Sequence, residues 1–321
     1  MFWLAWSLVL AQGGAPAPAP PSSAAAQGNA AYRRGEIVRA EELYREAVRQ
    51  DERDVDALLG LAKIHAAVSI QKEADRILEA AYHFHPEHRS VQVAWGRRRP
   101  TVEERIAMLE RAWGQMNPTS DEAAELRLEI EAERARGERR TVRRSELRET
   151  TIRLARLGTP GYLTGYGIAL RVNGKAVTLV FDTSAEGVRV TRAVARRLGL
   201  ERLAERPRVA GQPKIPSYHR PGDRYLAARV AAGSVEFENV PVEVVDGIGG
   251  QDGVISPALF EDFLVDIDWR RYQITLRPHP GEGKLPGFHK VFRFGSGLVL
   301  GVQVRGLAPK LFAIDSGNGR S

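Results

Sequence analysis

Apolar residues between positions 24 and 140 recur at the spacing of amphipathic helices, and the apolar pattern repeats after 34 residues. Small Ala residues in this pattern let two helices approach closely, whereas larger side chains fill the groove between them. We therefore predict a helical repeat array over residues 24–140, with a weaker third copy at 101–118 and a capping helix at 121–136. The repeat superposes Ala40 on Ala74, Tyr44 on Leu78, Ala47 on Ala81 and Glu52 on Pro86.

Two units of this array resemble the tetratricopeptide repeat. Leu58, Leu61 and Ala62 stand at first-helix positions of the second unit. Gly35 stands in a turn, and Glu52 departs from the usual Pro. The resemblance implies a concave face that binds a peptide or a partner protein. A packing spacer for the following domain is the alternative, and the sequence leaves both open.

Beyond Arg144 the pattern changes to short apolar runs separated by Gly and Pro, which predicts strands. Asn173-Gly174, between the first two runs, is typical of a tight hairpin turn. We expect a mainly β domain over residues 145–280. Its predicted strands cover residues 163–172, 176–181, 188–191, 225–231, 235–245, 264–268 and 273–277.

The candidate chemistry lies where the second of these strands ends. An apolar strand runs directly into Asp182, Thr183, Ser184 and Ala185, which places a carboxylate on a loop beside the core. The segment resembles the active-site motif of the pepsin and retroviral aspartic proteases, Asp-Thr/Ser-Gly-Ala/Ser/Thr. The resemblance implies that Asp182 is catalytic and that the hydroxyl of Thr183 supports it through hydrogen bonds.

Two further segments resemble bacterial retropepsin-like proteases. Residues 191–198, closed by Gly199, predict a short helix with a Gly cap. Residues 252–269 resemble the family's strand, helix and final strand pair. In that resemblance, Val254 and Ile255 are core residues that flank the catalytic loop.

Hydrolysis of this type needs two carboxylates that share one proton, so one motif is half a site. The segment around Asp182 recurs near the C-terminus, where residues 304–317 contain Asp315, Ser316 and Gly317. This internal duplication predicts that Asp182 faces Asp315, with Ser316 as the second supporting hydroxyl and Gly317 in the tight turn. Residues 285–321 then begin a second, truncated β lobe, and the fold class is a multidomain α+β protein.

Three departures from the family pattern keep other interpretations open. Ser184 replaces the Gly of the motif, Ser256 replaces a second Gly, and the sequence ends six residues after Asp315. One alternative is an inactive, protease-shaped module that binds peptides. Another is a homodimer in which each copy contributes its Asp182, as in the retroviral enzymes.

Composition narrows the remaining function classes. The chain has no Cys, which excludes disulfides and thiolate catalysis. Its net charge of +7 comes from Arg spread along the chain without a nucleic-acid-binding motif, so we expect no nucleic-acid partner. His83, His85 and His88 lie close together but lack the spacing of a metal site. We expect a polar turn there, with no metal and no cofactor.

The N-terminus is apolar from residue 2 to residue 11 and then alternates Ala with Pro. The apolar run is too short for a stable membrane anchor, and it resembles the core of a signal peptide, although the usual preceding Lys or Arg is missing. We expect residues 1–23 to be a signal peptide and linker. The protein would then be exported, either to the periplasm or out of the cell.

Overall fold

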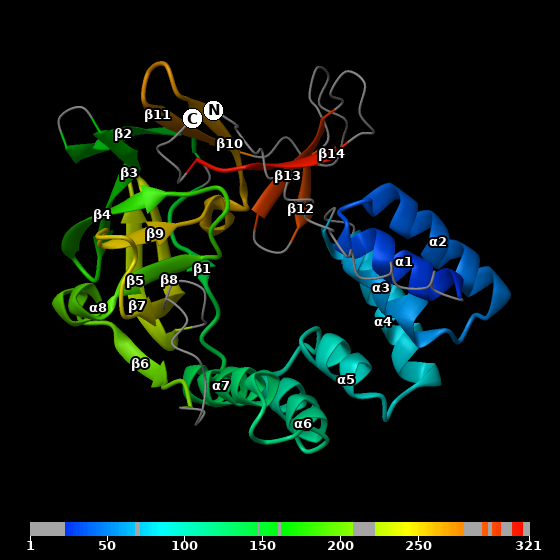
Figure 1. Ribbon diagram of the computed structural model, residues 1–321. Helices are drawn as coiled ribbons and strands as arrows, with labels where there is room; N and C mark the ends of the chain where they lie inside the picture. The colour runs from blue at the N-terminus through cyan, green and yellow to red at the C-terminus, as the bar shows by residue number, and fades with distance from the viewer. Residues whose placement is uncertain are drawn as a thin grey trace, which may run out of the picture.

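Helices α1–α7 make up the N-terminal part of the chain in the computed structural model, which describes residues 23–67, 71–146, 148–159, 162–207, 222–278, 291–294, 297–302 and 310–316 (Figure 1). The side-chain oxygens of Ser23, Thr101 and Ser120 accept backbone N–H groups of α1, α6 and α7 and so start these helices. The helices are α1 (Ala24–Arg33), α2 (Ile37–Gln50), α3 (Val55–Ala67), α4 (Gln71–Phe84), α5 (Arg89–Gly96), α6 (Val102–Trp113) and α7 (Asp121–Arg136).

The helices pack in succession as the pairs α1 with α2, α3 with α4, and α5 with α6. This arrangement confirms the predicted repeat array. The third unit is more complete than the sequence indicated, because α5 supplies the first helix of that pair. The repeat positions that align at a shift of 34 are buried at Ala40, Tyr44, Ala47, Ala74, Leu78 and Ala81.

The ring of Tyr44 lies between two glycines on neighbouring helices. A Cβ atom added at Gly28 would come within 2.7 Å of this ring, and one added at Gly60 within 2.4 Å. The Tyr44 hydroxyl donates a hydrogen bond of 2.7 Å to Oδ1 of Asn29. The large side chain therefore fills the space that the two glycines leave, as the repeat pattern predicted.

An eleven-stranded sheet follows the helices, and part of it closes into a barrel. Strands β3, β4, β9, β5, β8 and β7 pair in that order, and β7 pairs again with β3, which completes the ring. The strands are β1 (Val142–Arg143), β2 (Thr150–Thr159), β3 (Tyr162–Val172), β4 (Lys175–Phe181), β5 (Val188–Thr191), β6 (Glu201–Ala204), β7 (Asp223–Ala232), β8 (Val235–Val245), β9 (Gly253–Ile255), β10 (Phe263–Asp268) and β11 (Gln273–Pro278).

Strand β4 is part of the wall of this closed ring, where it pairs with β3 on one side and with β9 on the other. It runs antiparallel to β3 and parallel to β9. Leu179, Phe181 and Ile255 are fully buried in the core that the ring encloses. The loop that follows β4 therefore starts from a backbone that is hydrogen-bonded on both sides.

The predicted short helix is α8 (Arg192–Leu198). The Thr191 hydroxyl accepts the N–H of Val194 at the start of α8, and Gly199 ends it in the left-handed region with φ of 65°. A single turn of 3₁₀-helix, η2 (Pro257–Phe260), follows β9. All seven predicted strands are present, whereas β1, β2 and β6 of the same sheet were not predicted.

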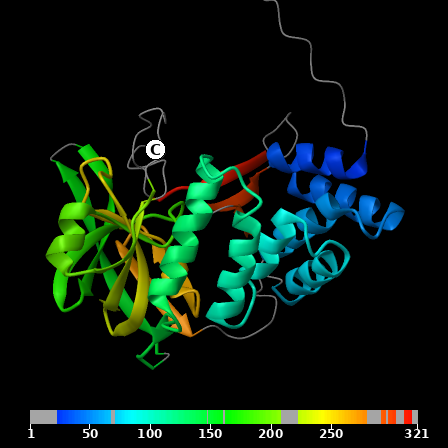
Figure 2. The ribbon, with the colours of Figure 1, turned by 90° about the horizontal axis from the view of Figure 1, so that it is seen from below.

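A second, three-stranded sheet lies between the barrel and the first helices of the array (Figures 1 and 2). It consists of β12 (Val291–Phe294), β13 (Gly297–Val302) and β14 (Lys310–Ile314), paired antiparallel in that order. Strand β12 contacts α3. At the other end of the array, α7 packs against β7 of the barrel and against β6, the edge strand beside it. The array thus touches both sheets.

None of the helices that the structure describes has the length and hydropathy needed to cross a membrane. The predicted signal peptide and nearly all of its linker lie outside the described residues.

Candidate active site

Asp182 is the first residue beyond β4, and its backbone and side chain are both held. Its N–H donates a hydrogen bond of 3.0 Å to the carbonyl of Ile255 on β9. Its Oδ1 atom accepts two hydrogen bonds of 2.7 Å, one from the N–H and one from the Oγ of Ser184. The Asp182 residue is half-buried, and hydrogen bonds within its loop fix the orientation of its carboxyl group. The backbone bond to β9 in turn fixes the start of this loop on the barrel.

Thr183 and Ser316 connect the two aspartate loops through reciprocal hydrogen bonds. The N–H of Thr183 donates to Ser316 Oγ at 2.9 Å, and the N–H of Ser316 donates to Thr183 Oγ1 at 3.1 Å. Each hydroxyl also donates to a carbonyl at the end of an aspartate-bearing strand. Thr183 bonds the carbonyl of Ile314, and Ser316 bonds that of Phe181 at 3.0 Å. Thr183 is buried, with 2% of its surface exposed.

These bonds bring together the two segments that the sequence duplication paired. Asp182 precedes Thr183, and Asp315 precedes Ser316, so the two carboxyl-bearing residues stand at equivalent positions of the joined loops. Asp315 follows β14 and is exposed. Gly317 lies outside the described residues. The catalytic roles of both aspartates stay predictions.

The two serines that replace family glycines have specific partners. Ser184 directs its hydroxyl back to Asp182, as described above. Ser256 is buried, and its Oγ accepts the N–H of Ala258 at 3.2 Å, which starts η2. Its N–H donates to the carbonyl of Gly187 at 2.8 Å. Ser256 therefore links η2 to Gly187, the residue directly before β5.

Gly253 is a residue of the site region that sequence reasoning missed. A Cβ atom at this position would come within 2.4 Å of the Arg189 carbonyl on β5. Strand β9 must approach β5 closely here because it also pairs with β4. The signal in the sequence was the single Gly before Val254 and Ile255.

Ion pairs join β5 and α8 to β7 and β8, and those of Arg192 lie at the end of β5 opposite the Asp182 loop. Arg192 of α8 pairs with Asp246 at 2.7 Å and with buried Asp223 at 2.6 Å. The hydrogen bond that Arg192 donates to Asp246 is the largest cause that raises the pKa of Arg192 above its usual value. Buried Glu243 pairs with Arg189 at 2.7 Å. These acidic residues hold strands and α8 together, and Asp182 is separate from them.

No group of three or more His, Asp or Glu side chains within the described ranges is arranged to hold a metal ion. Of the three clustered histidines, His85 contacts the backbone oxygen of Arg53 through its ring nitrogen. That contact joins the turn after α4 to the turn after α2.

Residues 168–257 match the sequence profile of the aspartyl protease family. The matched segment starts within β3, includes Asp182, Thr183 and Ser184, and extends just past Ser256. The barrel part of the chain is therefore similar in sequence to the aspartyl protease family. A comparison with curated protein sequences gives no match.

Three solved structures are similar to parts of the chain. A retropepsin-like aspartic protease from Rickettsia conorii is 22% identical over 41% of this chain and 92% of its own, with a TM-score of 0.28. The retroviral protease-like domain of Ddi1 from Leishmania major is 17% identical over 36% of this chain and 95% of its own, with a TM-score of 0.24. A tetratricopeptide repeat protein from Parabacteroides merdae is 16% identical over 35% of this chain and 44% of its own, with a TM-score of 0.29.

Proposed function

We propose that this protein is an aspartic-type endopeptidase whose catalytic pair, Asp182 and Asp315, comes from a single chain. The observation that carries the proposal is the reciprocal hydrogen bonding of Thr183 and Ser316. Those four bonds join two loops that each present a carboxyl group directly before the bonded hydroxyl residue. An isolated Asp turn would need no such partner loop.

The chemistry follows from two carboxyl groups that share one proton. The ionised carboxylate takes a proton from a water molecule, and the water oxygen attacks the peptide carbonyl carbon. The protonated carboxyl donates its proton to the carbonyl oxygen, which gives a neutral tetrahedral diol. Collapse of the diol breaks the C–N bond: the carboxyl that took the water proton gives it to the leaving amine, and a diol hydroxyl gives its proton to the other carboxylate, which restores the shared proton.

The test is cleavage of a labelled, unfolded protein from acid to neutral pH. Asp182→Asn and Asp315→Asn should each lower kcat/KM by about 10²-fold or more, because each removes a group that must exchange a proton. Asp252→Asn is the matched control, since Asp252 is exposed and pairs with Arg197 at 2.7 Å outside the catalytic loop. Full activity in Asp182→Asn rejects the assignment.

The same variants separate the single-chain pair from a homodimer that joins two copies of Asp182. In a homodimer of that kind, Asp315→Asn keeps full activity and the rate depends on the second power of chain concentration when the dimer is dilute. A first-order dependence, together with loss of activity in Asp315→Asn, supports the single-chain pair. Full activity in Asp315→Asn, with a rate that depends on the second power of chain concentration, would instead favour the retroviral arrangement.

A second candidate function is a catalytically inactive module that binds peptides. The observation that favours it is the Ser184 hydroxyl, which occupies Oδ1 of Asp182 where the family motif has Gly. In that case fluorescence anisotropy detects binding of an unfolded peptide by the wild-type chain, but no product forms at any pH. Formation of product by the wild-type chain, and not by Asp182→Asn, excludes this candidate.

We also propose that the helical array binds a peptide or protein and that the chain is exported. Support for the first comes from the packed helix pairs, and for the second from the apolar run at residues 2–11. Mass spectrometry of the mature protein from cell fractions tests export. A chain that keeps residue 1 and stays in the cytoplasm contradicts it.

A further inference from the structure

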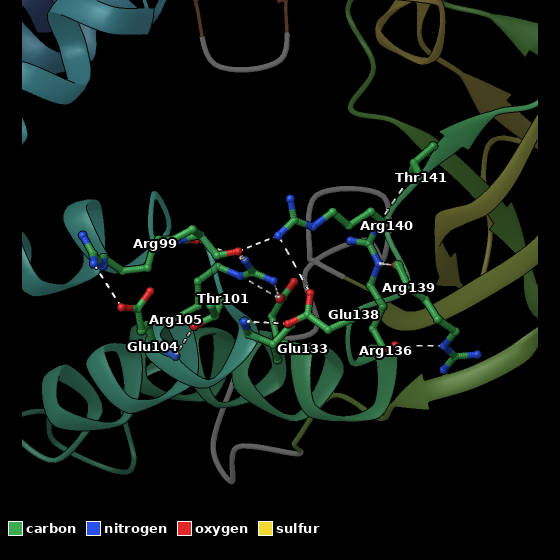
Figure 3. Close-up of polar contacts among 12 residues, drawn as sticks. Arg99, Thr101, Glu104, Arg105, Glu133, Arg136, Glu138, Arg139, Arg140 and Thr141 are labelled. Atoms are coloured by element: carbon green, nitrogen blue, oxygen red, sulfur yellow. Dashed lines mark hydrogen bonds and ion pairs between the residues drawn. The ribbon is translucent and has the colours of Figure 1, made fainter.

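The segment that joins the helical array to the barrel is fixed by contacts with both parts, and Figure 3 shows the contacts on the array side. The carboxylate of Glu138 accepts the N–H of Val102 at 3.1 Å, at the start of α6. Arg139 pairs with Glu201 of β6 at 2.6 Å, and Thr141 donates to the carbonyl of Asn239 at 3.0 Å. The array and the barrel are therefore held in one relative orientation at this junction.

A cavity of about 410 Å³ lies on the array side of this junction. Four arginines and two glutamates supply its charged groups, so the positive side chains exceed the negative ones by two. The lining residues are Arg97, Arg105, Leu109, Glu129, Glu133, Arg136 and Arg140.

Both glutamates of the lining form ion pairs with arginines of the same lining. Arg97 pairs with Glu129 at 2.7 Å, and Arg105 pairs with Glu133 at 3.0 Å. Arg140 pairs at 3.8 Å with Glu138, which lies outside the lining, so Arg136 is the lining arginine that pairs with no carboxylate of the described residues.

Arg136 donates to neutral oxygens at the junction. Its hydrogen bonds reach the carbonyl of Arg139 at 2.6 Å and the hydroxyl of Thr141 at 3.4 Å. Partial burial lowers the pKa of Arg136, and the nearby charges of Arg105, Arg139 and Arg140 lower it further, against the opposing effect of Glu133. The folded chain thus holds a half-buried cation at a net electrostatic cost.

We propose that this cavity binds an oxyanion, either a phosphate or a carboxylate group, through Arg136 and Arg140. The planar guanidinium presents parallel N–H donors that match two oxygens of such a group. An anion here would offset the surplus positive charge. Water compensates a partly buried charge less well than an opposite charge does. The cavity exceeds the volume of a lone phosphate, so the group can be carried by a larger molecule.

A second cavity of about 400 Å³ shares Arg97, Glu129, Glu133 and Arg136 with the first. It extends along α7 to residues 186–188, which directly follow the Asp182 loop. Its lining holds five glutamates and three arginines, so a polypeptide that lies along α7 would place one carboxylate at Arg136 and keep other acidic groups out of this cavity. A free phosphate is the other source of the same chemistry.

The first experiment measures the thermal unfolding midpoint in phosphate and in chloride at equal ionic strength. Phosphate should raise the midpoint of the wild-type chain by about 2 °C or more, because a ligand that binds only the folded state stabilises it. Arg136→Gln should lose this shift. Arg134→Gln is the matched control on the same helix, since exposed Arg134 pairs with Glu110 away from the cavity, and it should keep the shift.

The second experiment distinguishes the two sources of the oxyanion. Anisotropy titrations use an acidic peptide with a single Glu and its amide counterpart, in which that residue is Gln. They use the Asp182→Asn chain, so binding is measured without cleavage and the result does not depend on the proposed catalysis. Binding of the acidic peptide at least about tenfold tighter than the amide peptide, lost on adding Arg136→Gln, supports a polypeptide carboxylate. A phosphate shift without peptide discrimination supports a free oxyanion.

The proposal is overturned if neither phosphate nor the acidic peptide has an effect that Arg136→Gln removes. In chloride, Arg136→Gln should be at least as stable as the wild type, because it removes a poorly compensated charge. If that variant does not fold, Arg140→Gln serves as the second variant. Its side chain is exposed, so the fold tolerates its loss, and it should weaken the same two effects.

Discussion

The hydroxyl of Thr183 accepts the backbone N–H of Ser316 at 3.1 Å, and the hydroxyl of Ser316 accepts the backbone N–H of Thr183 at 2.9 Å. The two residues are 133 positions apart in sequence. Their bonds hold the loop of a closed barrel against the loop of a separate three-stranded sheet. Any change that removes one hydroxyl should therefore loosen the position of both aspartates.

Thr183→Val keeps the side-chain shape and removes the hydroxyl. We expect kcat/KM to fall by about tenfold or more and the unfolding free energy to fall by about 1–3 kcal/mol, because the Ser316 N–H and the Ile314 carbonyl lose their partner. Peptide cleavage and urea unfolding measure the two effects. Thr178→Val, at an exposed position of β4, is the matched control and should change neither. Equal behaviour of the two variants would show that the loops are not coupled.

Ser184→Gly restores the family residue beside Asp182. The variant loses the hydroxyl bond to Oδ1 but keeps the backbone N–H bond of 2.7 Å. We expect cleavage to be retained, with kcat/KM equal to that of the wild type or up to about tenfold higher. The reason is that a water molecule can replace the Ser184 hydroxyl as hydrogen-bond donor to Oδ1 of Asp182. A large loss of activity would mean that the serine hydroxyl is itself needed.

Gly60→Ala should destabilise the helical array although Ala is the better helix former. The added methyl would lie within 2.4 Å of the buried Tyr44 ring, and overpacking of that kind outweighs the gain in helix propensity. We expect the thermal midpoint, followed by circular dichroism at the helix minimum, to fall by about 3 °C or more. Gly114→Ala is the control, because its nearest neighbours stand at 3.6 Å. A matching fall in the control would remove the steric explanation.

The stability of the array should fall as the pH rises above 10. Burial raises the pKa of Tyr44 to about 12, against an ordinary value of 10. The unfolded chain therefore loses the phenol proton first, and the free energy of unfolding declines between pH 10 and pH 12. In Tyr44→Phe this decline should be smaller, so the two stability curves converge towards pH 12. Urea midpoints across this range measure the curves, and parallel curves would contradict the assignment.

The strands that sequence could predict were those with continuous or alternating apolar residues. β5 and β8 have the predicted bounds because their apolar residues face a closed core. β2 was missed because Arg153 and Arg156 interrupt its apolar pattern, although Ile152 and Leu154 are buried. β6 has four residues and buries only Ala204, which is too little pattern to recognise.

The site was predictable in part because a duplicated strand and loop leaves a visible trace in the sequence. That trace indicated that the Thr183 and Ser316 loops pair. The junction left no such trace, because its partners are far apart in sequence and occur as ordinary surface charges. Arg139 and Glu201, for example, are 62 positions apart. Pairings of this kind depend on how folded parts meet and have no local pattern.

The helical array contacts the barrel through α7 and the second sheet through α3, so the chain returns to itself at two places (Figure 1). The helices from α3 to α7 therefore form a second connection between the sheet that carries Asp182 and the sheet that carries Asp315, besides the hydrogen bonds of their loops. A change in how these helices stack would shift one sheet relative to the other.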